Sequence, residues 1–212
     1  MKLLLTQFTT VSNLLQGYAM IRTLRETAEI HLGQSIRDKI ENIPSGSHFI
    51  VQMKDVIKNA GVKADGLYKI NLKGRIEPRL VKKGDLLFVS RVFRGSLPYS
   101  VLVNTDLPNL VAAPTFTILS VDKDMVRAEY LNWFINSEAH GGKYFKKNAM
   151  GSSILNIPKS VLSNMEIPVP SLEIQDKIIK LIQTAEREKE IMETLVEKRR
   201  AFMDEVLANY IE

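Results

Sequence analysis

Apolar side chains at helical spacing dominate the C-terminal end of this chain. Residues 171–212 contain neither Gly nor Pro, and their apolar positions follow one another in steps of three, four or seven. This pattern is typical of one continuous amphipathic helix, which over this length extends about 60 Å, twice the diameter of a small domain. A single domain cannot cover such a stripe, so we expect a partner helix to bury it. The stripe comprises Ile174, Ile178, Leu181, Ala185, Met192, Leu195, Phe202 and Val206.

The rest of the chain has shorter patterns that predict a strand-rich α+β domain. Period-two alternation and apolar runs predict strands at 21–35, 48–53, 67–72, 86–90, 100–103, 115–121 and 154–157. Helical spacing predicts short helices at 128–137 and 159–163, and a helical turn at 55–60. The run 86–90 is apolar enough to be buried on both faces, and the basic segment 91–96 after it is expected to leave the sheet.

A proline-rich joint separates the two parts of the chain. Ile167-Pro168-Val169-Pro170 must be extended, because residues before Pro are pushed out of helical geometry, and Ser171 is then a natural N-cap. We therefore expect a domain over 1–170 and a long helix over 171–212. Residues 1–22 fit either a short helix or an added strand, and the sequence suggests no role for them.

The charge is unevenly divided between these parts. Residues 171–212 carry 7 Lys+Arg and 10 Asp+Glu, which leaves 22 and 14 of the totals of 29 and 24 for residues 1–170. The body is therefore basic and the helix acidic. A basic body fits either a solvated surface or a polyanion partner, because cations gain affinity by releasing counterions from phosphates.

Catalytic and metal-binding patterns are missing from the sequence. There is no Cys, and His31, His48 and His140 lack the spacing of a metal pair. The nucleophile elbow, the phosphate-cradling glycine loops, the D-x-K and E-x-K tripeptides of one nuclease type and a methyltransferase base pocket are also absent. No window predicts a membrane span or a secretory signal. We expect a cytoplasmic protein that is not an enzyme and binds no cofactor or metal itself.

Several short segments follow one another in a distinctive order along the chain. They include Lys83-Gly84-Asp85-Leu86-Leu87-Phe88-Val89-Ser90-Arg91, Val111-Ala112-Ala113-Pro114, Gly151-Ser152-Ser153-Ile154, Ile167-Pro168-Val169-Pro170 and Glu197-Lys198-Arg199-Arg200. In this order they resemble the specificity (S) subunit of type I restriction–modification systems, in a half-length form with a single target-recognition domain. The resemblance extends over roughly residues 23–205, and the order of the segments carries it more than any one motif does.

The resemblance implies a non-catalytic reader of double-stranded DNA. Members of this family recognise a split sequence through two target-recognition domains held apart by a helical coiled coil. The coiled coil also docks methyltransferase (M) subunits, which bind S-adenosylmethionine, and a restriction (R) subunit can join. With one such domain over 1–170 and one helix over 171–212, this chain is expected to read one half-site and to form a homodimer through antiparallel pairing of its helix. Pairing with another half-length subunit is the other option.

Twelve polar residues of the body are candidate DNA contacts. Arg91 and Arg94 follow a buried strand and suit bidentate contacts to guanine, although a surface salt bridge explains them equally well. Gln52 and Lys54 are expected on one strand face, for adenine and phosphate respectively, with a solvated polar face as the alternative. The candidates are Arg37, Lys39, Gln52, Lys54, Arg91, Arg94, Lys143, Lys146, Lys147, Asn148, Ser152 and Ser153.

Lysines interleaved with aromatic residues form the most basic cluster among these candidates. Lys143, Lys146 and Lys147 suit phosphate contacts, while the neighbouring Tyr144 and Phe145 are expected in the core. Ser152 and Ser153, after Gly151, could present backbone N–H groups to a phosphate or simply form a turn. The alternative to a DNA reader is a helical interaction module whose body binds protein, or nucleic acid without sequence preference.

Overall fold

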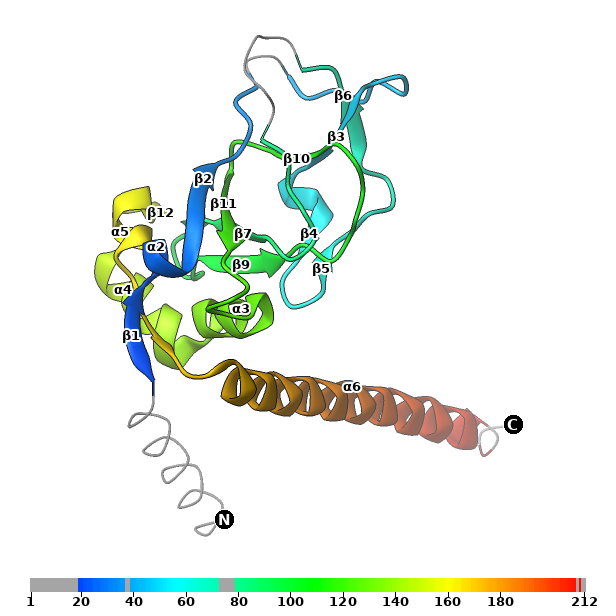
Figure 1. Ribbon diagram of the computed structural model, residues 1–212. Helices are drawn as coiled ribbons and strands as arrows, with labels where there is room; N and C mark the ends of the chain where they lie inside the picture. Colours follow the sequence, from blue (N-terminus) through cyan, green and yellow to red (C-terminus); the bar gives the residue numbers. More distant parts are fainter. Residues whose placement is uncertain (1–18, 37–38, 73–78, 209, 211–212) are drawn as a thin grey trace. The chain divides into compact units, whose positions relative to one another are not determined.

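The computed structural model describes residues 19–36, 39–72, 79–208 and 210. The chain divides into two compact units, Met1–Leu172 and Glu173–Glu212, close to the boundary expected at the proline-rich joint. The second unit consists of most of helix α6 (Leu172–Ala208), an uninterrupted helix of 37 residues. The α+β class, with a strand-rich first part and a long C-terminal helix, is confirmed (Figure 1).

A four-stranded antiparallel sheet forms the centre of the first unit. Its order is β2–β11–β7–β9. The strands are β2 (Ala28–Leu32), β11 (Phe116–Val121), β7 (Leu86–Val89) and β9 (Tyr99–Leu102). Every residue of β7 is buried, as the apolar run predicted.

A second sheet of three strands packs into the same core. Its order is β10–β3–β6, with β10 parallel and β6 antiparallel to β3. The strands are β10 (Leu110–Ala112), β3 (His48–Val51) and β6 (Tyr68–Ile70). Ile50 and Val111 of this sheet belong to one buried cluster with Leu87, Val89 and Ile118 of the first. The two sheets are therefore joined by one hydrophobic core.

The opposite side chains of β7 point toward a helical layer. Phe88 lies with its ring centroid 5.3 Å from that of Phe145, and neither side chain is accessible to solvent. This layer contains α3 (Ala128–Asn136), the short π-helix η2 (Glu138–Gly142) and α4 (Lys143–Asn148). The contact seats α4 on the sheet and leaves the polar side of that helix facing outward.

Helix α3 also closes the exposed edge of the sheet. In the edge strand β9, the Ser100 amide donates to Asn136 Oδ1 at 2.8 Å, and Asn136 Nδ2 donates to the Ser100 carbonyl at 2.9 Å. The side-chain amide of Asn136 thus pairs with the strand as another backbone would. Such pairing satisfies backbone groups that would otherwise be open to association with another chain.

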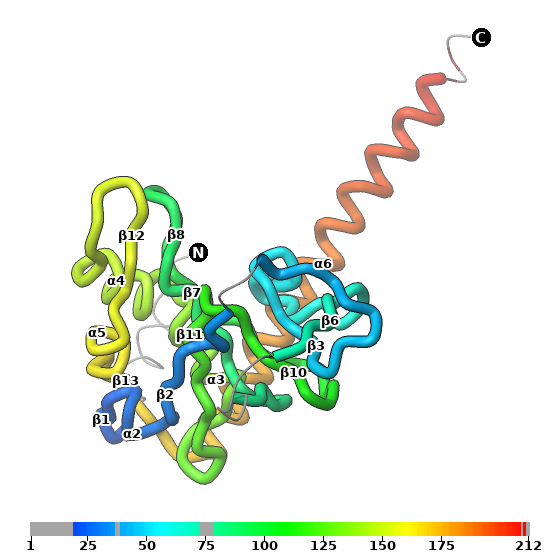
Figure 2. Tube along the Cα trace, turned by 90° about the horizontal axis from the view of Figure 1, so that it is seen from above, coloured from blue at the N-terminus to red at the C-terminus, as the bar shows by residue number. Residues whose placement is uncertain are grey.

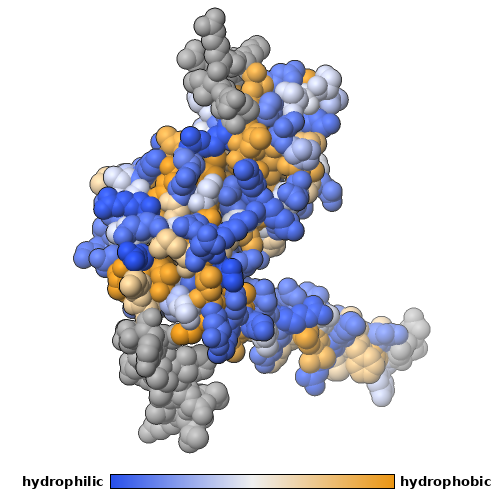
Figure 3. Space-filling model, in the orientation of Figure 1, coloured by the Kyte–Doolittle hydropathy of each residue, from blue (hydrophilic) through white to orange (hydrophobic). Residues whose placement is uncertain are grey.

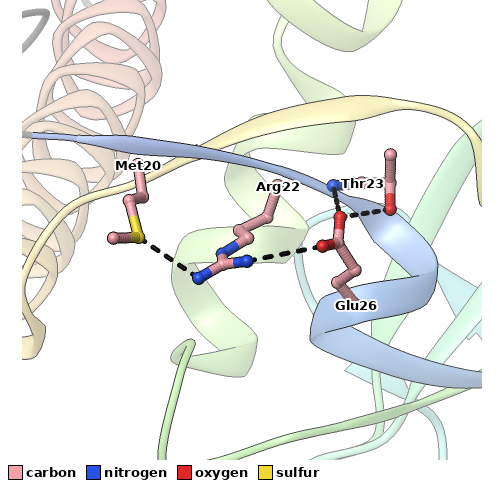
Figure 4. A network of polar contacts seen from close by, with 4 residues as sticks. All are labelled: Met20, Arg22, Thr23 and Glu26. Atoms are coloured by element: carbon pink, nitrogen blue, oxygen red, sulfur yellow. Dashed lines mark hydrogen bonds and ion pairs between the residues drawn. The ribbon is translucent and has the colours of Figure 1, made fainter.

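The strand expected over 21–35 is wrong in its middle, because a one-turn helix divides it. The observed elements are β1 (Met20–Thr23), α2 (Leu24–Thr27) and then β2. Glu26 Oε2 accepts from the Thr23 amide at 2.7 Å and from the Thr23 hydroxyl at 2.5 Å (Figure 4). These bonds, with Arg22 nearby, lower the pKa of Glu26. The Thr-x-x-Glu pattern is a capping signature, and it was the sequence signal for this helix.

Strand β1 pairs with β13 (Glu166–Val169), the extended segment that precedes α6. Tyr130 of α3 fixes this segment, since its hydroxyl donates to the Pro168 carbonyl at 2.6 Å. Burial raises the pKa of Tyr130 to about 12, so the hydroxyl stays protonated and remains a donor. The expected extended conformation of the proline-rich joint is therefore held by both a strand and a helix.

The segment after β3 also differs from expectation. The strand predicted over 48–53 ends at Val51, and residues 53–55 form the 3₁₀-helix η1 (Met53–Asp55). The helical turn predicted over 55–60 is wrong, because β4 (Val56–Ile57) pairs there with β5 (Gly61–Val62). Asp55, which is buried, accepts from the Gln52 amide at 2.9 Å and so ends the strand early.

Immediately after β7 the chain leaves the sheet, as predicted for residues 91–96. Strand β8 (Arg91–Phe93) pairs antiparallel with β12 (Ile154–Asn156). We call these two strands, together with residues 94–96 after β8 and 150–153 before β12, the ribbon. A bond of 2.9 Å from the Ile157 amide to the Ser90 carbonyl ties its base to the end of β7. Helix α5 (Lys159–Ser163) follows β12.

We expect the ribbon tip to depend on Gly151 more than on Gly95. Both have positive φ, 110° and 100°, but a Cβ on Gly151 would lie 2.1 Å from the Ile154 carbonyl oxygen, whereas a Cβ on Gly95 meets nothing within 4 Å. Gly95→Ala should cost about 1–2 kcal/mol in backbone strain. Gly151→Ala should cost more, because the clash adds to a similar strain. Urea unfolding of both variants measures this, and equal losses of stability would contradict it.

Candidate nucleic-acid interface

The structure gathers seven of the twelve candidate residues into one region. Arg91, Arg94, Ser152 and Ser153 lie on the ribbon, and Lys143, Lys146 and Lys147 lie on α4, which is joined to the ribbon through Asn148 and Ala149. Figure 2 shows β8, β12 and α4 together at one end of the first unit, with β3 and β6 at the other end. The ribbon with α4 is therefore the candidate interface.

Arg91 and Arg94 are exposed at the start and at the tip of β8. Neither guanidinium has an ion-pair or hydrogen-bond partner within the described part of the chain, so the surface salt bridge considered from sequence is not formed there. Their backbone is nevertheless fixed, because Arg91 is in register with Asn156 and the Arg94 amide donates to the Ser153 carbonyl at 3.0 Å. Two exposed cations, unpaired as far as the described residues go, thus lie on an ordered two-stranded support.

The loop of Gly151, Ser152 and Ser153 lies beside the tip of β8. Both serines are exposed. The Ser153 carbonyl is engaged by Arg94, and Met150 on the other side of the loop exchanges two backbone bonds with Asn156, of 3.0 and 2.8 Å. The loop therefore folds back beside β12 and brings its serines to the same edge as Arg94.

Helix α4 presents its lysines outward because its apolar side is fixed inward. Phe145 is fully buried, as expected for a core aromatic, and the Tyr144 hydroxyl donates to the Val161 carbonyl at 2.7 Å. Lys146 lies 3.5 Å from Glu138 Oε1, but both side chains are largely exposed, so this pair contributes little. Lys143 and Lys147 form no ion pair among the described residues.

Asn148 is less available than the lysines beside it. Its Nδ2 donates to the Tyr144 carbonyl at 2.8 Å, and the side chain is half-buried. The amide therefore satisfies the last turn of α4. We assign it a structural part in holding the end of the helix.

Gln52 and Lys54 lie away from this interface and do not share a strand face. That expectation is wrong because the strand ends at Val51, and both residues belong to the turn around η1. Lys54 Nζ lies 3.3 Å from the centre of the Tyr68 ring, a cation–π contact. The Gln52 amide nitrogen is buried with no hydrogen-bond partner among the described residues, so it does not face a ligand at the surface.

The remaining candidates, Arg37 and Lys39, follow β2. Arg37 lies outside the described residues. Lys39 is exposed and lies 3.6 Å from Glu41 Oε1, a contact of small energetic weight at the surface. Lys39 belongs to neither the ribbon nor α4.

Sequence reasoning missed the outward face of the ribbon. Residues in antiparallel register share a face, so Phe93 with Ile154, and Arg91 with Asn156, point the same way. Met150 bridges to Asn156 and joins this face. The period-two pattern of the two short strands was the available signal. The pairing of the two strands could not be predicted, because they are far apart in the sequence.

Within the described residues, no group of three or more His, Asp or Glu side chains could hold a metal ion. His140 stacks on Phe134, with ring centroids 4.9 Å apart, and burial, then the charge of Lys143, lowers its pKa. This is the setting of a structural histidine. Across the same part of the chain, no helix has the length and apolar character needed to cross a membrane.

Solved structures with a similar fold come from type I restriction–modification systems. The S subunit from M. genitalium has a TM-score of 0.52 at 19% identity, and the alignment covers 88% of this chain and 44% of that one. The HsdS subunit from Thermoanaerobacter tengcongensis gives 0.58 at 18%, covering 81% and 43%. A chain from a study of complex assembly in the type I R-M system gives 0.65 at 17%, covering 86% and 46%.

This chain therefore spans less than half the length of the structures that it matches. A search of curated proteins found no match. The family model for the type I restriction modification DNA specificity domain matches residues 19–198, most of the chain. A fold shared with S subunits and a family match over this length lead to one conclusion: the chain belongs to the type I restriction modification DNA specificity domain family.

Proposed function

We propose that the chain is a non-catalytic, sequence-specific DNA-binding subunit that reads one half-site with the ribbon and α4. The observation that carries this proposal is the pair of exposed guanidinium groups of Arg91 and Arg94, which have no partner among the described residues, on an ordered two-stranded ribbon. Membership in a DNA specificity family supports the same role.

A two-stranded ribbon is one of the elements that fit the major groove of B-DNA. That groove is about 12 Å wide and admits a two-stranded ribbon, and each base pair presents a distinct set of donors and acceptors there. An Arg that grips guanine O6 and N7 contributes about 1–3 kcal/mol against a wrong base. The guanidinium groups of Arg91, on β8, and of Arg94, in the turn after β8, could make two such contacts.

The lysines of α4 would contact phosphates and hold the ribbon in register. Phosphate contacts position a protein on the duplex and base contacts specify the sequence. Lys143 and Lys147 are exposed and without ion pairs among the described residues, and Phe145 anchors their helix against β7. An exposed Ser152 or Ser153 next to the ribbon tip suits a further phosphate contact.

Helix α6 would pair with a second long helix. Its apolar side chains recur among charged ones (Figure 3), and Leu181, Met192, Leu195 and Phe202 are 53–68% exposed. A helix of this length gains most of its stability by burying such a face. We infer antiparallel pairing with a second copy of this chain, which would place two reading domains on one split site.

The paired helices would also position methyltransferase subunits, which bring S-adenosylmethionine, and a restriction subunit can join the same complex. The specificity family and its solved relatives support this assembly. Such a complex acts on cellular DNA, and the chain would therefore work in the cytoplasm.

DNA binding should depend on the cations of the interface. Each cation that neutralises a phosphate adds about 0.9 to the magnitude of the salt slope of log K. Changing Arg91, Arg94, Lys146 and Lys147 to Gln should therefore reduce that magnitude by about 2, because the two lysines are assigned to phosphates and the two arginines to bases. Arg91→Ala with Arg94→Ala should also relax the choice of sequence. Fluorescence anisotropy over a salt series, with selected and scrambled duplexes, measures both effects.

A matched control removes the same charge elsewhere on the first unit. Lys58, Lys63, Lys82 and Lys123 are exposed and lie outside the ribbon and α4. Changing these four to Gln should alter the salt slope much less. If neutralising the interface set leaves DNA binding unchanged, the site assignment is refuted. Weak binding with no sequence preference would instead favour a protein-interaction module.

Association of the chain should depend on the apolar face of α6. Met192→Glu with Leu195→Glu introduces charges into that face and should convert dimers into monomers, because two carboxylates would be buried at the contact. Thr194→Glu adds a carboxylate to another side of the same helix and should leave the dimer intact. Light scattering across a concentration series tests this, and monomers of the unmodified chain at high concentration would contradict it.

A further inference from the structure

The outward face of the ribbon carries large apolar side chains that are mostly exposed. Phe93 is 77% exposed and its cross-strand partner Ile154 is 54% exposed, with Met150 at 59% beside them. The opposite face of the ribbon provides the packing: Val92 lies against the core and Leu155 is half-buried. Exposed apolar side chains that cluster in one patch often mark a binding surface.

The surroundings of this apolar centre are basic and polar. Arg91 and Asn156 are paired with each other on the same face, one step from the Phe93–Ile154 pair. Within the described residues, neither the Arg91 guanidinium nor the Asn156 side-chain amide forms a hydrogen bond. Arg94, which is also exposed, follows Phe93 directly in the chain. An apolar centre flanked by arginines is complementary to a polyanion that itself presents an apolar group.

The major groove of DNA offers one such group, the C5-methyl of thymine. Phe is among the side chains that contact it, while Asn reads adenine N6 and N7 and Arg reads guanine. The minor groove is about 6 Å wide and presents no methyl group. The outward face therefore combines residues for a thymine methyl, an adenine and a guanine within two cross-strand pairs, with the Val92–Leu155 pair between them on the opposite face.

We propose that Phe93 and Ile154 read a thymine methyl group within the half-site, with Arg91 and Asn156 contacting the adjoining base edges. This inference rests on the proposed function, because it requires the ribbon to lie in the major groove. It adds that the half-site contains at least one thymine whose methyl group contributes to affinity. Phe93 and Ile154 are then specificity-determining residues that act without hydrogen bonds.

Replacing thymine by deoxyuridine tests the contact, since this removes only the methyl group. Full-length protein would first select its preferred duplex from a random library, and each thymine of that duplex would then be replaced singly. At one or more positions, affinity measured by anisotropy should fall about four-fold, the effect of removing one buried methyl-sized group. Phe93→Ala should bind the two duplexes equally, and Phe93→Leu should keep most of the difference.

Ile57→Ala serves as the matched control for Ile154→Ala. Ile57 is 45% exposed on β4, away from the ribbon. Its variant should retain the four-fold ratio between thymine and deoxyuridine duplexes, whereas Ile154→Ala should reduce it. Because the ratio is taken within one protein, any general loss of stability cancels.

The outcomes separate this inference from the proposed function. If no duplex is enriched, both fail. If a duplex is enriched and depends on Arg91 and Arg94, but contains no thymine or tolerates every deoxyuridine, only the inference fails. If Phe93→Ala weakens binding to the thymine and deoxyuridine duplexes equally, Phe93 acts as an apolar wedge or has a structural role. If Phe93→Ala leaves binding to both duplexes unchanged, the apolar face binds a protein and not DNA. Either result overturns the thymine contact.

Discussion

Burial of β7 on both faces is the constraint on which the first unit depends. Leu87 and Val89 point into the core shared by the two sheets, while Phe88 points to the helical layer and meets Phe145. A strand that is buried on both faces has no side chain that can contact a ligand. Side chains that contact a ligand must therefore come from the segment after the strand, outside the sheet. The chain does this at Ser90, where it leaves the sheet and becomes β8.

The same strand fixes both halves of the candidate interface. Its end is bonded to the base of the ribbon through Ser90 and Ile157, and its Phe88 side chain seats α4 through Phe145. The arginines and the lysines are therefore positioned by one rigid strand, although they come from different segments. This arrangement suits recognition of a stiff ligand such as duplex DNA, because a reading surface held by packed elements is more precise than one on a loose loop.

The two faces of the ribbon have different surroundings, one packed and one exposed. Its inner side chains, Val92 and Leu155, stabilise its attachment, which leaves the outer side free to carry residues chosen for binding. Helix α6 shows a related division, with charged residues between apolar side chains such as Leu181 and Phe202 that are exposed. For the exposed apolar groups of both elements we propose a partner, which is a base for the ribbon and a second helix for α6.

Local patterns were enough to predict helix α6, the buried strand β7, helix α3 and the exit of the chain at residue 91, because periodicity and turn residues act over a few neighbours. The Thr23–Glu26 capping box was equally local and was missed. Tertiary structure decided the pairing of β8 with β12, the closing of the β9 edge by Asn136 and the early end of β3 at Asp55. These contacts join segments distant in the chain or depend on burial, and no short window contains both partners. For that reason the sequence was enough to select the arginines and lysines of the candidate interface, but only the fold showed Phe93 and Ile154 on the same ribbon.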